Sequence, residues 1–334
     1  MPEFYYEDFN PGDDLKFSRG REVTKEEIIR FAEQYDPQPF HLDEAAGRAS
    51  ILGGLSASGW HTCSMMMRAN YDHWISRTAS LGAPGIEQVK WMKPVLPGDM
   101  LRFVRRVVDK RVSRTKPDMG FVTFEMDGFN QRGEQFFFQK HMQMVAVRRP
   151  QGAPQPAARD RSKAEEKPQK PQDSGFGSGG YFEDIPLNAY SESGSSTFTK
   201  DSIVAFAREF DPQPFHLDEA AARASHFGGL AASGWQTASL WMRNGILRRQ
   251  EWLKEQRARG VETVEGGPSP GFTDMRWIKP VLAGDTVTFG SMVVEKRLTS
   301  RKGWGLAFSH NTGFNQHGDL VFSYRGSHFV PVRG

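Results

Sequence analysis

Length, composition and charge already narrow the class of protein. The chain has 334 residues, of which 38% are hydrophobic and 25% charged, and its formal net charge is +3. At ~150 residues per domain, this length predicts two domains that are each large enough for their own core. The small positive excess is spread along the chain without a basic tail or domain, which argues against a nucleic-acid-binding protein.

Cysteine use and hydropathy bear on the compartment. Cys63 is the single cysteine, so no intrachain disulfide can form, which fits a reducing cytoplasm. The longest stretches without charged residues, Ala49–Met67 and Ala224–Met242, are rich in Gly, Ser and Thr and too polar for a membrane span. The first residues have no apolar core typical of a signal peptide. We therefore expect a cytoplasmic protein without membrane association.

The chain contains an internal repeat. Residues 36–68 and 211–243 are identical at 25 of 33 aligned positions. Downstream, WMKPVLPGD (91–99) matches WIKPVLAGD (277–285), and the second copy carries 11 extra residues before that motif. Copies of this size predict two homologous domains rather than a solenoid, whose units are ~20–50 residues long.

The repeat sets the domain boundaries. We expect domains at 1–149 and 181–334, separated by residues 150–180, which are rich in Pro, Gly and charge and predicted to be disordered. Two near-copies can form the contact that a homodimer would use, so we expect an intrachain pseudo-dimer. Two separate domains on a string are the alternative, and a further homo-oligomer stays open.

In chain order, the first predicted elements are helices. Thr24 and Glu27 form a capping-box pattern, which predicts a helix to about Gln34 with Ile28, Phe31 and Ala32 facing inward. Residues 36–41 contain two prolines and are expected to be irregular. A short helix over 43–50 and a long, mostly apolar helix over 58–74 follow.

The remainder of each copy has strand character. Residues 101–108, 121–126 and 136–147 are rich in β-branched and aromatic residues and are separated by turn signals, which predicts antiparallel strands. Each half is therefore expected to be α+β, with one central helix packed on an antiparallel sheet.

An aspartate and a histidine recur in both copies. Asp36 and His41 lie five residues apart across the proline-containing segment, and Asp211 and His216 repeat the pattern. A carboxylate and an imidazole that converge on one water form a general acid/base pair. The alternatives are a turn-capping Asp with a structural His, or a metal site with Asp43. No further His or Cys cluster supports a metal, so none is expected.

A glycine-rich turn precedes the long helix in both copies. In the first copy it reads Gly53-Gly54-Leu55-Ser56-Ala57-Ser58-Gly59-Trp60, and its equivalent ends at Trp235. Such a turn directs free backbone N–H groups and the positive end of the helix dipole toward whatever lies before the helix. This arrangement suits an oxyanion that forms on a bound carbonyl. Close packing of helix on sheet is the structural alternative.

These motifs resemble a known family. D-P-Q-P-F-H-L-D, then G-G-L-x-A-S-G-W, then K-P-V-L-x-G-D is similar, once per half, to the MaoC-like dehydratases, relatives of (R)-specific enoyl-CoA hydratase. The resemblance implies a hotdog fold, a long helix wrapped by an antiparallel sheet, paired with acyl-thioester sites at the interface. It implies that Asp36 with His41, and Asp211 with His216, hold the reacting water. The oxyanion and substrate-binding positions then fall on Gly59, Gly234, Ser58, Ser233, Trp60 and Trp235.

The chain departs from the family pattern at three places per half. Gln38 and Gln213 stand where Asn is common, Met67 and Met242 where some members have Ser, and both tryptophans where smaller residues are usual. These changes leave the Asp–His pairs intact and indicate an altered substrate shape.

The resemblance implies hydration of 2-enoyl-CoA or dehydration of (R)-3-hydroxyacyl-CoA, with no cofactor because coenzyme A belongs to the substrate. An acyl-CoA thioesterase and a non-catalytic acyl-thioester-binding protein are the alternatives, since fold does not fix function. Cations must meet the coenzyme A phosphates. The candidates are Arg105, Arg106, Lys110, Arg111, Lys296 and Arg297, and the same two basic runs also contain Arg102, Arg114, Lys116, Arg301 and Lys302.

Overall fold

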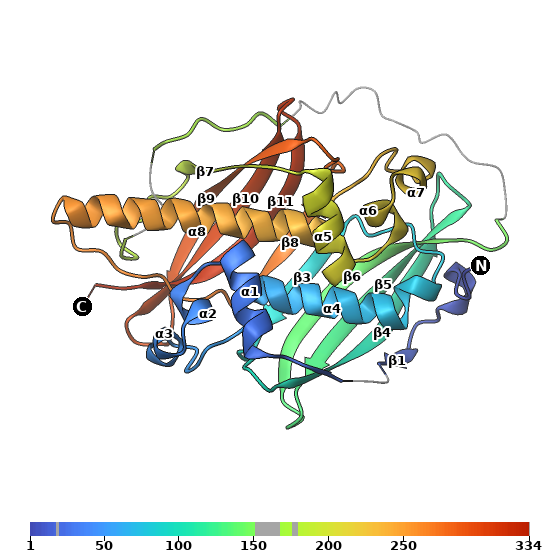
Figure 1. Ribbon diagram of the computed structural model, residues 1–334, viewed down its shortest axis with the longest axis horizontal. Coiled ribbons are helices and arrows are strands. Elements are labelled where there is room, and N and C mark those ends of the chain that lie inside the picture. The colour runs from blue at the N-terminus through green and yellow to red at the C-terminus, as the bar shows by residue number, and fades with distance from the viewer. Residues whose placement is uncertain (18–19, 151–167, 176–179, 334) are drawn as a thin grey trace.

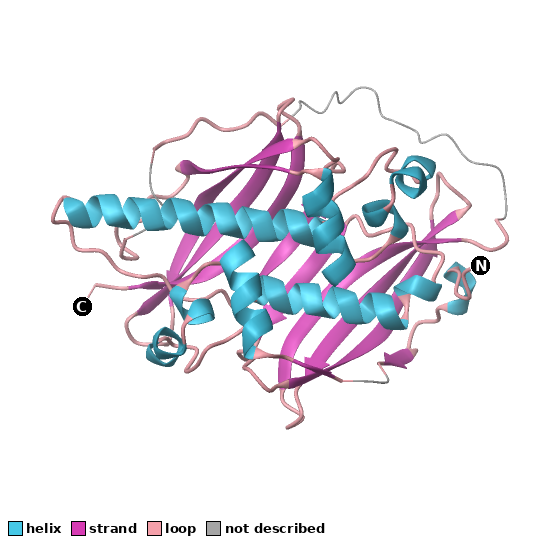
Figure 2. Ribbon diagram, viewed as in Figure 1, coloured by secondary structure: helices cyan, strands magenta, loops and turns pink. Residues whose placement is uncertain are grey.

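One antiparallel sheet runs through both halves of the chain. The structure is a computed structural model that describes residues 1–17, 20–150, 168–175 and 180–333. Among these residues the sheet has 11 strands in the order β1-β4-β5-β6-β3-β8-β11-β10-β9-β7, with β2 also paired to β4. The helices cover one face of this sheet, and the two long helices lie side by side on it (Figures 1 and 2). The α+β expectation is confirmed.

The elements repeat in the two halves. The strands are β1 (Asp14–Lys16), β2 (Arg21–Glu22), β3 (Gly85–Trp91), β4 (Met100–Val112), β5 (Met119–Phe129), β6 (Gln135–Ala146), β7 (Tyr190–Thr197), β8 (Gly271–Trp277), β9 (Thr286–Leu298), β10 (Trp304–Asn315) and β11 (Leu320–Pro331). The α-helices are α1 (Lys25–Tyr35), α2 (Pro39–Leu42), α3 (Glu44–Ala49), α4 (Gly59–His73), α5 (Lys200–Phe210), α6 (Pro214–Leu217), α7 (Glu219–Ala224) and α8 (Gly234–Ala258).

The halves join where β3 pairs with β8. Val89 lies opposite Phe272 in this antiparallel pair. A Cβ on Gly85 would lie 2.1 Å from the Met275 carbonyl oxygen, and one on Gly271 would lie 2.1 Å from the Val89 carbonyl oxygen. Glycine at these two equivalent positions therefore allows the backbones to approach. The expected pseudo-dimer is confirmed as one continuous sheet.

The predicted helices form with small differences. Thr24 caps α1 by accepting from the Glu27 N–H, and Ile28, Phe31 and Ala32 are buried as predicted. The capping box is only half formed, because the Glu27 carboxylate accepts from Arg21. The extra residues of the second copy extend its long helix, so α8 has 25 residues where α4 has 15.

The proline segment differs from its prediction. Residues 39–42 form one helical turn, α2, rather than an irregular stretch, and residues 214–217 repeat it as α6. Pro39 is the first residue of its turn, where no intrahelical partner for an N–H is needed and the fixed φ suits a helix. The turn carries His41, which is thereby placed on a fixed backbone.

The hydrophobic core is shared between the halves. Trp60 at the start of α4 stacks on Phe272 of β8, with ring centroids 5.3 Å apart, and both belong to one buried cluster. Within the described part of the chain, none of the helices combines the length and apolar character needed to cross a bilayer.

Most of the segment expected to be disordered, at 151–167 and 176–179, lies outside the described residues. Its described part, 168–175, has no regular secondary structure and lies against β7. There the Ser174 N–H donates to the Tyr190 carbonyl oxygen, and Lys170 forms an ion pair with Glu192.

Candidate active site

The Asp36 carboxylate is buried and held by two neighbours. Asp36 follows the last residue of α1 and is 2% exposed. Its Oδ1 accepts from Gln38 Nε2 at 2.9 Å, and its Oδ2 accepts from Ser58 Oγ at 2.5 Å. Each oxygen therefore has one donor and keeps a lone pair for another.

The His41 ring is fixed by a backbone carbonyl. Its Nδ1 lies 2.6 Å from the Ser56 carbonyl oxygen, which can only accept, so the Nδ1 carries the proton. The Nε2 then faces Asp36 Oδ2 at 3.6 Å. Burial lowers the pKa of His41, against the smaller opposing effect of the Asp36 charge, which favours the neutral ring.

Two acceptors this close can be bridged by one water that lies to one side of both. Neutral His41 Nε2 and Asp36 Oδ2 both offer lone pairs and cannot hydrogen-bond to each other directly. A water molecule that donates one hydrogen to each would satisfy both, and its own lone pairs would remain free. The arrangement is thus able to bind and deprotonate a nucleophilic water.

The second half repeats the geometry. Asp211 Oδ1 accepts from Gln213 Nε2 at 3.0 Å and Oδ2 from Ser233 Oγ at 2.7 Å. The His216 Nδ1 lies 2.7 Å from the Ala231 carbonyl oxygen, and its Nε2 lies 3.4 Å from Asp211 Oδ2. The predicted Asp and His are therefore brought together in both halves.

Two predicted substrate-binding residues have a positioning role. Ser58 and Ser233 are the N-caps of α4 and α8, where each hydroxyl accepts from an N–H of the helix and donates to the carboxylate. Neither lines the cavity beside its Asp–His pair. The structure gives both serines a role in positioning Asp36 and Asp211, and their assignment to substrate contact stays a prediction. The glutamines, which the sequence showed only as departures, position the same carboxylates.

The glycines at the helix starts face both the cavities and a packed indole. A Cβ on Gly59 would lie 2.6 Å from the Trp91 ring, and one on Gly234 would lie 2.1 Å from the Trp277 ring. As first residues of α4 and α8, both have N–H groups without an acceptor in their helix. Close packing and a place in the cavity wall therefore coexist at both glycines.

Each cavity is completed by the other half. The cavity beside Asp211 and His216 has a volume of about 290 Å³, and Met67 of α4 forms part of its wall. The cavity beside Asp36 and His41 has a volume of about 260 Å³, and Met242 of α8 lines it. The two methionines at the departures from the family pattern thus shape the opposite half's site. Trp60 and Trp235 also line their own cavities.

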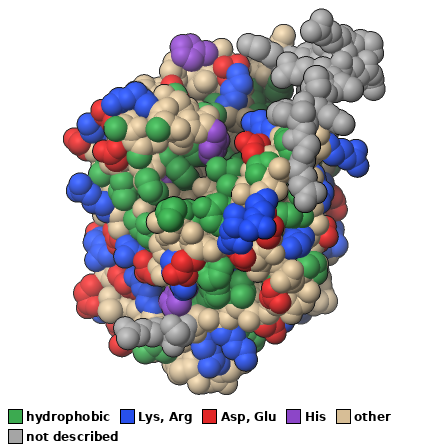
Figure 3. Space-filling model, turned by 90° about the vertical axis from the view of Figure 1, so that its right-hand side faces the viewer, with side chains coloured by type: hydrophobic (Ala, Val, Ile, Leu, Met, Phe, Trp, Pro, Cys, Tyr) green, Lys and Arg blue, Asp and Glu red, His purple; other side chains and the backbone are tan. Residues whose placement is uncertain are grey.

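The side of the molecule that carries α6 and α7 is shown in Figure 3. Apolar side chains gather across the middle of this face, and charged side chains surround them. The cavity beside Asp211 has apolar walls of this kind, including Phe215, Phe227 and Val281. Such walls suit an acyl chain more than a highly polar ligand.

The six residues proposed for coenzyme A phosphates line neither cavity. Arg105 is completely buried, because successive residues of a strand point to opposite faces and position 105 faces the helices. Lys296 donates to two backbone carbonyls of residues 182 and 185. The other four interact with neighbouring side chains or backbone: Arg106 with Asp14 and Glu125, Lys110 with Glu7 and Asn10, Arg111 with Phe121 and Arg297 with Phe308.

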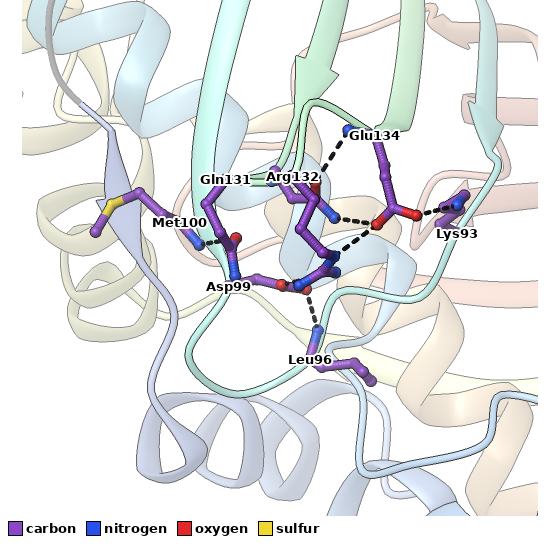
Figure 4. Close-up of polar contacts among 8 residues, drawn as sticks. Lys93, Leu96, Asp99, Met100, Gln131, Arg132 and Glu134 are labelled. Carbon is purple, nitrogen blue, oxygen red and sulfur yellow. Dashed lines mark hydrogen bonds and ion pairs between the residues drawn. The ribbon is translucent and has the colours of Figure 1, made fainter.

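Other cations do line the cavities. Lys93 and Arg301 line the one beside Asp36, and Lys279 lines the one beside Asp211. Lys93 forms an ion pair with Glu134, which also binds Arg132 of the neighbouring hairpin, as Figure 4 shows. The lysines belong to the repeated K-P-V-L motif, so this repeat was the signal that could have identified them. Arg301 comes from the opposite half.

Among the described residues, no group of three or more His, Cys, Asp or Glu side chains is arranged to hold a metal ion. Asp43, the third ligand of the weaker metal hypothesis, instead caps α3 by accepting from the Ala46 N–H at 2.8 Å.

The chain thus consists of two repeated units that share one sheet. Each unit has a buried Asp–His pair beside the start of its long helix, and the other unit completes the cavity next to that pair. The chain belongs to the MaoC-like domain family, whose model matches residues 8–125 and 183–305. The resemblance noted from the sequence is confirmed, and the fold is a double hotdog.

Several known proteins are similar to the whole chain in structure or to part of it in sequence. A putative MaoC domain protein dehydratase from Chloroflexus aurantiacus is 16% identical with a TM-score of 0.77, covering 100% of this chain and 99% of its own. A conserved hypothetical protein from Mycobacterium tuberculosis, described as a double hotdog, is 14% identical with a TM-score of 0.69 over 97% of each chain. The uncharacterized protein YdeM of Bacillus subtilis is 27% identical over 36% of this chain and 84% of its own length.

Proposed function

We propose that the protein hydrates 2-enoyl-CoA thioesters, or dehydrates (R)-3-hydroxyacyl-CoA thioesters in the reverse direction. One observation carries the proposal. In both halves a buried carboxylate and a buried imidazole are held 3.4–3.6 Å apart, each with a free lone pair toward the other. Membership of the MaoC-like family, some of whose similar structures are described as dehydratases, supports it.

The reaction follows from the positions of the groups. The thioester carbonyl accepts from the Gly59 or Gly234 N–H, which polarises the conjugated double bond and makes Cβ electrophilic. The water between Asp and His loses one proton to this pair as its oxygen forms a bond to Cβ. The π electrons move toward the carbonyl oxygen, where the helix N-terminus stabilises the charge. A proton returned to Cα completes the addition.

Either the Asp or the His accepts the proton in this scheme, and the other orients the water. The Gln and Ser donors hold the carboxylate so that its second lone pair on Oδ2 points to the water. Proton transfer by a positioned side chain typically contributes 10²–10⁴-fold to a rate. We assign no cofactor, since the thioester itself supplies the electron sink.

The test is the ultraviolet absorbance of a trans-2-enoyl-CoA with the purified protein, alongside a thiol assay of the same sample. Loss of enoyl absorbance without free thiol supports hydration, whereas thiol release without prior loss identifies a thioesterase. The double variant Asp36→Asn/Asp211→Asn should lose turnover by at least ~10²-fold. Asp201→Asn, an exposed carboxylate in the first turn of α5, is the matched control and should retain it. Full activity of the double variant would contradict the mechanism.

A further inference from the structure

The two cavities differ in the wall that the opposite half of the chain supplies. Beside Asp211 this wall includes Asn70 of α4 and Gln139, His141 and Gln143 of β6. All four side chains are buried and polar. A short acyl chain that ends against this wall would meet hydrogen-bonding groups rather than an apolar surface.

The equivalent positions of the other half are different. Phe137 lies opposite Trp91 as Phe322 lies opposite Trp277, which aligns β6 with β11 at an offset of 185 residues. Tyr324, Gly326 and His328 therefore replace Gln139, His141 and Gln143, and none of the three lines the cavity beside Asp36. Tyr324 belongs to a buried cluster of rings, 4.9 Å from the ring of Trp241 between centroids. The polar wall is thus confined to one site.

A buried cation lies directly behind the polar wall. The Arg105 guanidinium donates to Asn70 Oδ1 at 3.2 Å and to Gln143 Oε1 at 2.5 Å, and lies 3.4 Å from the centre of the Phe124 ring. In the described part of the chain, no Asp or Glu forms an ion pair with it, and burial alone lowers its pKa to about 9. It is therefore charged at neutral pH without a counter-charge. The equivalent residue in β9 is Ser291.

The arrangement leaves N–H groups for a ligand. Because Arg105 occupies the amide oxygens of Asn70 and Gln143, their NH2 groups are left to donate, and Gln143 uses its own on Ser80 Oγ at 3.0 Å. Gln139 Nε2 donates to His141 Nδ1 at 3.1 Å, which places the His141 proton on Nε2. If the Gln139 amide were turned over, its Oε1 would accept from His141 Nδ1–H and its NH2 group would be free to donate. In either orientation the Gln139–His141 pair therefore keeps one N–H for a ligand.

One atom of the wall lacks a partner. The buried Oε1 of Gln139 has no hydrogen bond in the described structure. As an acceptor, this oxygen does not itself favour an anion; with the Gln139 amide turned over, the oxygen pairs with His141 Nδ1–H and an N–H of Gln139 is the unpaired group instead. N–H donors in front of an uncompensated positive charge favour an anion.

We propose that the Asp211–His216 site takes acyl-CoA substrates whose acyl chain ends in a carboxylate, bound by Asn70 and His141 with the charge of Arg105 behind them. This rests on the proposed function, because it makes the Asp211–His216 cavity the acyl site. The ring-filled Asp36–His41 site takes acyl chains without such a group. A chain ending in methyl would leave the donors of the polar wall unpaired, which disfavours it.

The test compares two enoyl-CoA esters of equal chain length, one ending in a carboxylate and one in a methyl group. In Asp36→Asn, which retains only the Asp211–His216 pair, kcat/KM should favour the carboxylate by at least ~10-fold. In Asp211→Asn this preference should be absent. Equal kcat/KM for both esters in Asp36→Asn would overturn the proposal.

Variants of the wall localise the preference. Arg105→Met should abolish it by raising KM for the carboxylate ester, and Asn70→Ala, which leaves the buried cation in place, should reduce it. Gly245→Ala, at the position of α8 equivalent to Asn70, is the matched control and should leave the preference unchanged. An unchanged preference in Asn70→Ala and Arg105→Met together would contradict the assignment.

A binding measurement separates this proposal from the proposed function. Calorimetry of the double variant Asp36→Asn/Asp211→Asn with the two saturated acyl-CoA esters reports the preference without turnover. Tighter binding of the carboxylate ester by at least ~10-fold supports the proposed wall even where hydration fails. Binding of the carboxylate ester that adding Arg105→Met leaves unchanged overturns it even where hydration is observed.

Discussion

Arg105 of β4 and Asp211 at the end of α5 are joined by an unbroken series of side-chain hydrogen bonds across the two halves. Arg105 binds Gln143, Gln143 donates to Ser80, Ser80 donates to Gln213 at 3.5 Å, and Gln213 donates to Asp211. The N-terminal half therefore helps to orient the carboxylate of the C-terminal half. At the position of Arg105 the other half has Ser291, which instead donates to Asn311.

The other oxygen of the Asp211 carboxylate depends on Ser233. Ser233→Ala removes the hydroxyl that donates to Oδ2 and caps α8. In an Asp36→Asn background we expect kcat to fall by about 10-fold, since the water-binding oxygen loses its orientation, and stability to fall by ~1 kcal/mol through the lost cap.

Ser233→Thr is the control, because its hydroxyl can make both bonds and it should retain most of kcat and stability. Steady-state kinetics and urea unfolding of the same preparations measure the two effects. A loss of stability in Ser233→Ala with unchanged kcat would leave Ser233 only its capping role.

The helices could be predicted well from the sequence, because their capping and periodicity signals lie within a few neighbouring residues. Thr24 and Ser58 precede their helices in the sequence as they do in space. The β3 strand was not predicted, and its burial does not alternate strictly: Ile86 and Val89 are both buried although they lie three residues apart, because the pairing with β6 shifts between Ile86 and Gln88. Because β3 forms the joint between the halves, the residues of the cross-half walls could not be named, although the family resemblance implies sites at the interface.

The error at Arg105 has a physical cause. Leu101, Phe103 and Val107 are buried at every second position of β4, and position 105 falls in the same series. Charge alone suggested a surface cation, whereas strand periodicity places Arg105 inside. Roles that depend on a contact between distant segments, such as Ser58 with Asp36, leave no signature in one sequence.

The pH dependence of the Asp36–His41 site follows from its burial. Burial lowers the pKa of His41 below its ordinary value of 6.5, so the ring stays neutral and able to accept a proton in moderately acidic solution. In the Asp211→Asn variant, kcat/KM should stay level from pH 7.5 down through 6.5 and decline only at lower pH. A pH profile of kcat/KM measures this. An acidic limb centred at or above pH 6.5 would contradict the assigned environment of His41.

Because His141 is buried, the folded protein should lose stability in acid. Burial, followed by the nearby Arg105 charge, lowers its pKa from 6.5 to about 3. The unfolded chain therefore binds a proton at His141 that the folded chain does not between pH 6.5 and about 3. Its contribution is fully present above pH 6.5 and is lost as pH falls through this window, by up to ~1.4 kcal/mol per pH unit.

His141→Gln removes this titration. The free energy of unfolding of the variant should fall less steeply than that of the parent between pH 6 and 4, as measured by urea unfolding at each pH. Other buried histidines with lowered pKa values, His61 and His328, keep part of the slope in both proteins. Parallel curves would show that His141 does not titrate as its burial implies.

The glycines at the helix starts give the sharpest test of the close packing beside each cavity. Gly234→Ala would place its Cβ 2.1 Å from the Trp277 ring, which must then shift. Because Trp277 lines the Asp211 cavity, we expect a loss of about 1–3 kcal/mol of stability and at least ~10-fold in kcat/KM of that site in an Asp36→Asn background. Gly245→Ala lies inside α8 with nothing within 4 Å of its new Cβ, and should stabilise the protein by ~0.5–1 kcal/mol. Urea unfolding and steady-state kinetics of both variants measure these effects. If Gly234→Ala is as stable and as active as Gly245→Ala, the Trp277 ring moves without cost and close packing does not require glycine at position 234.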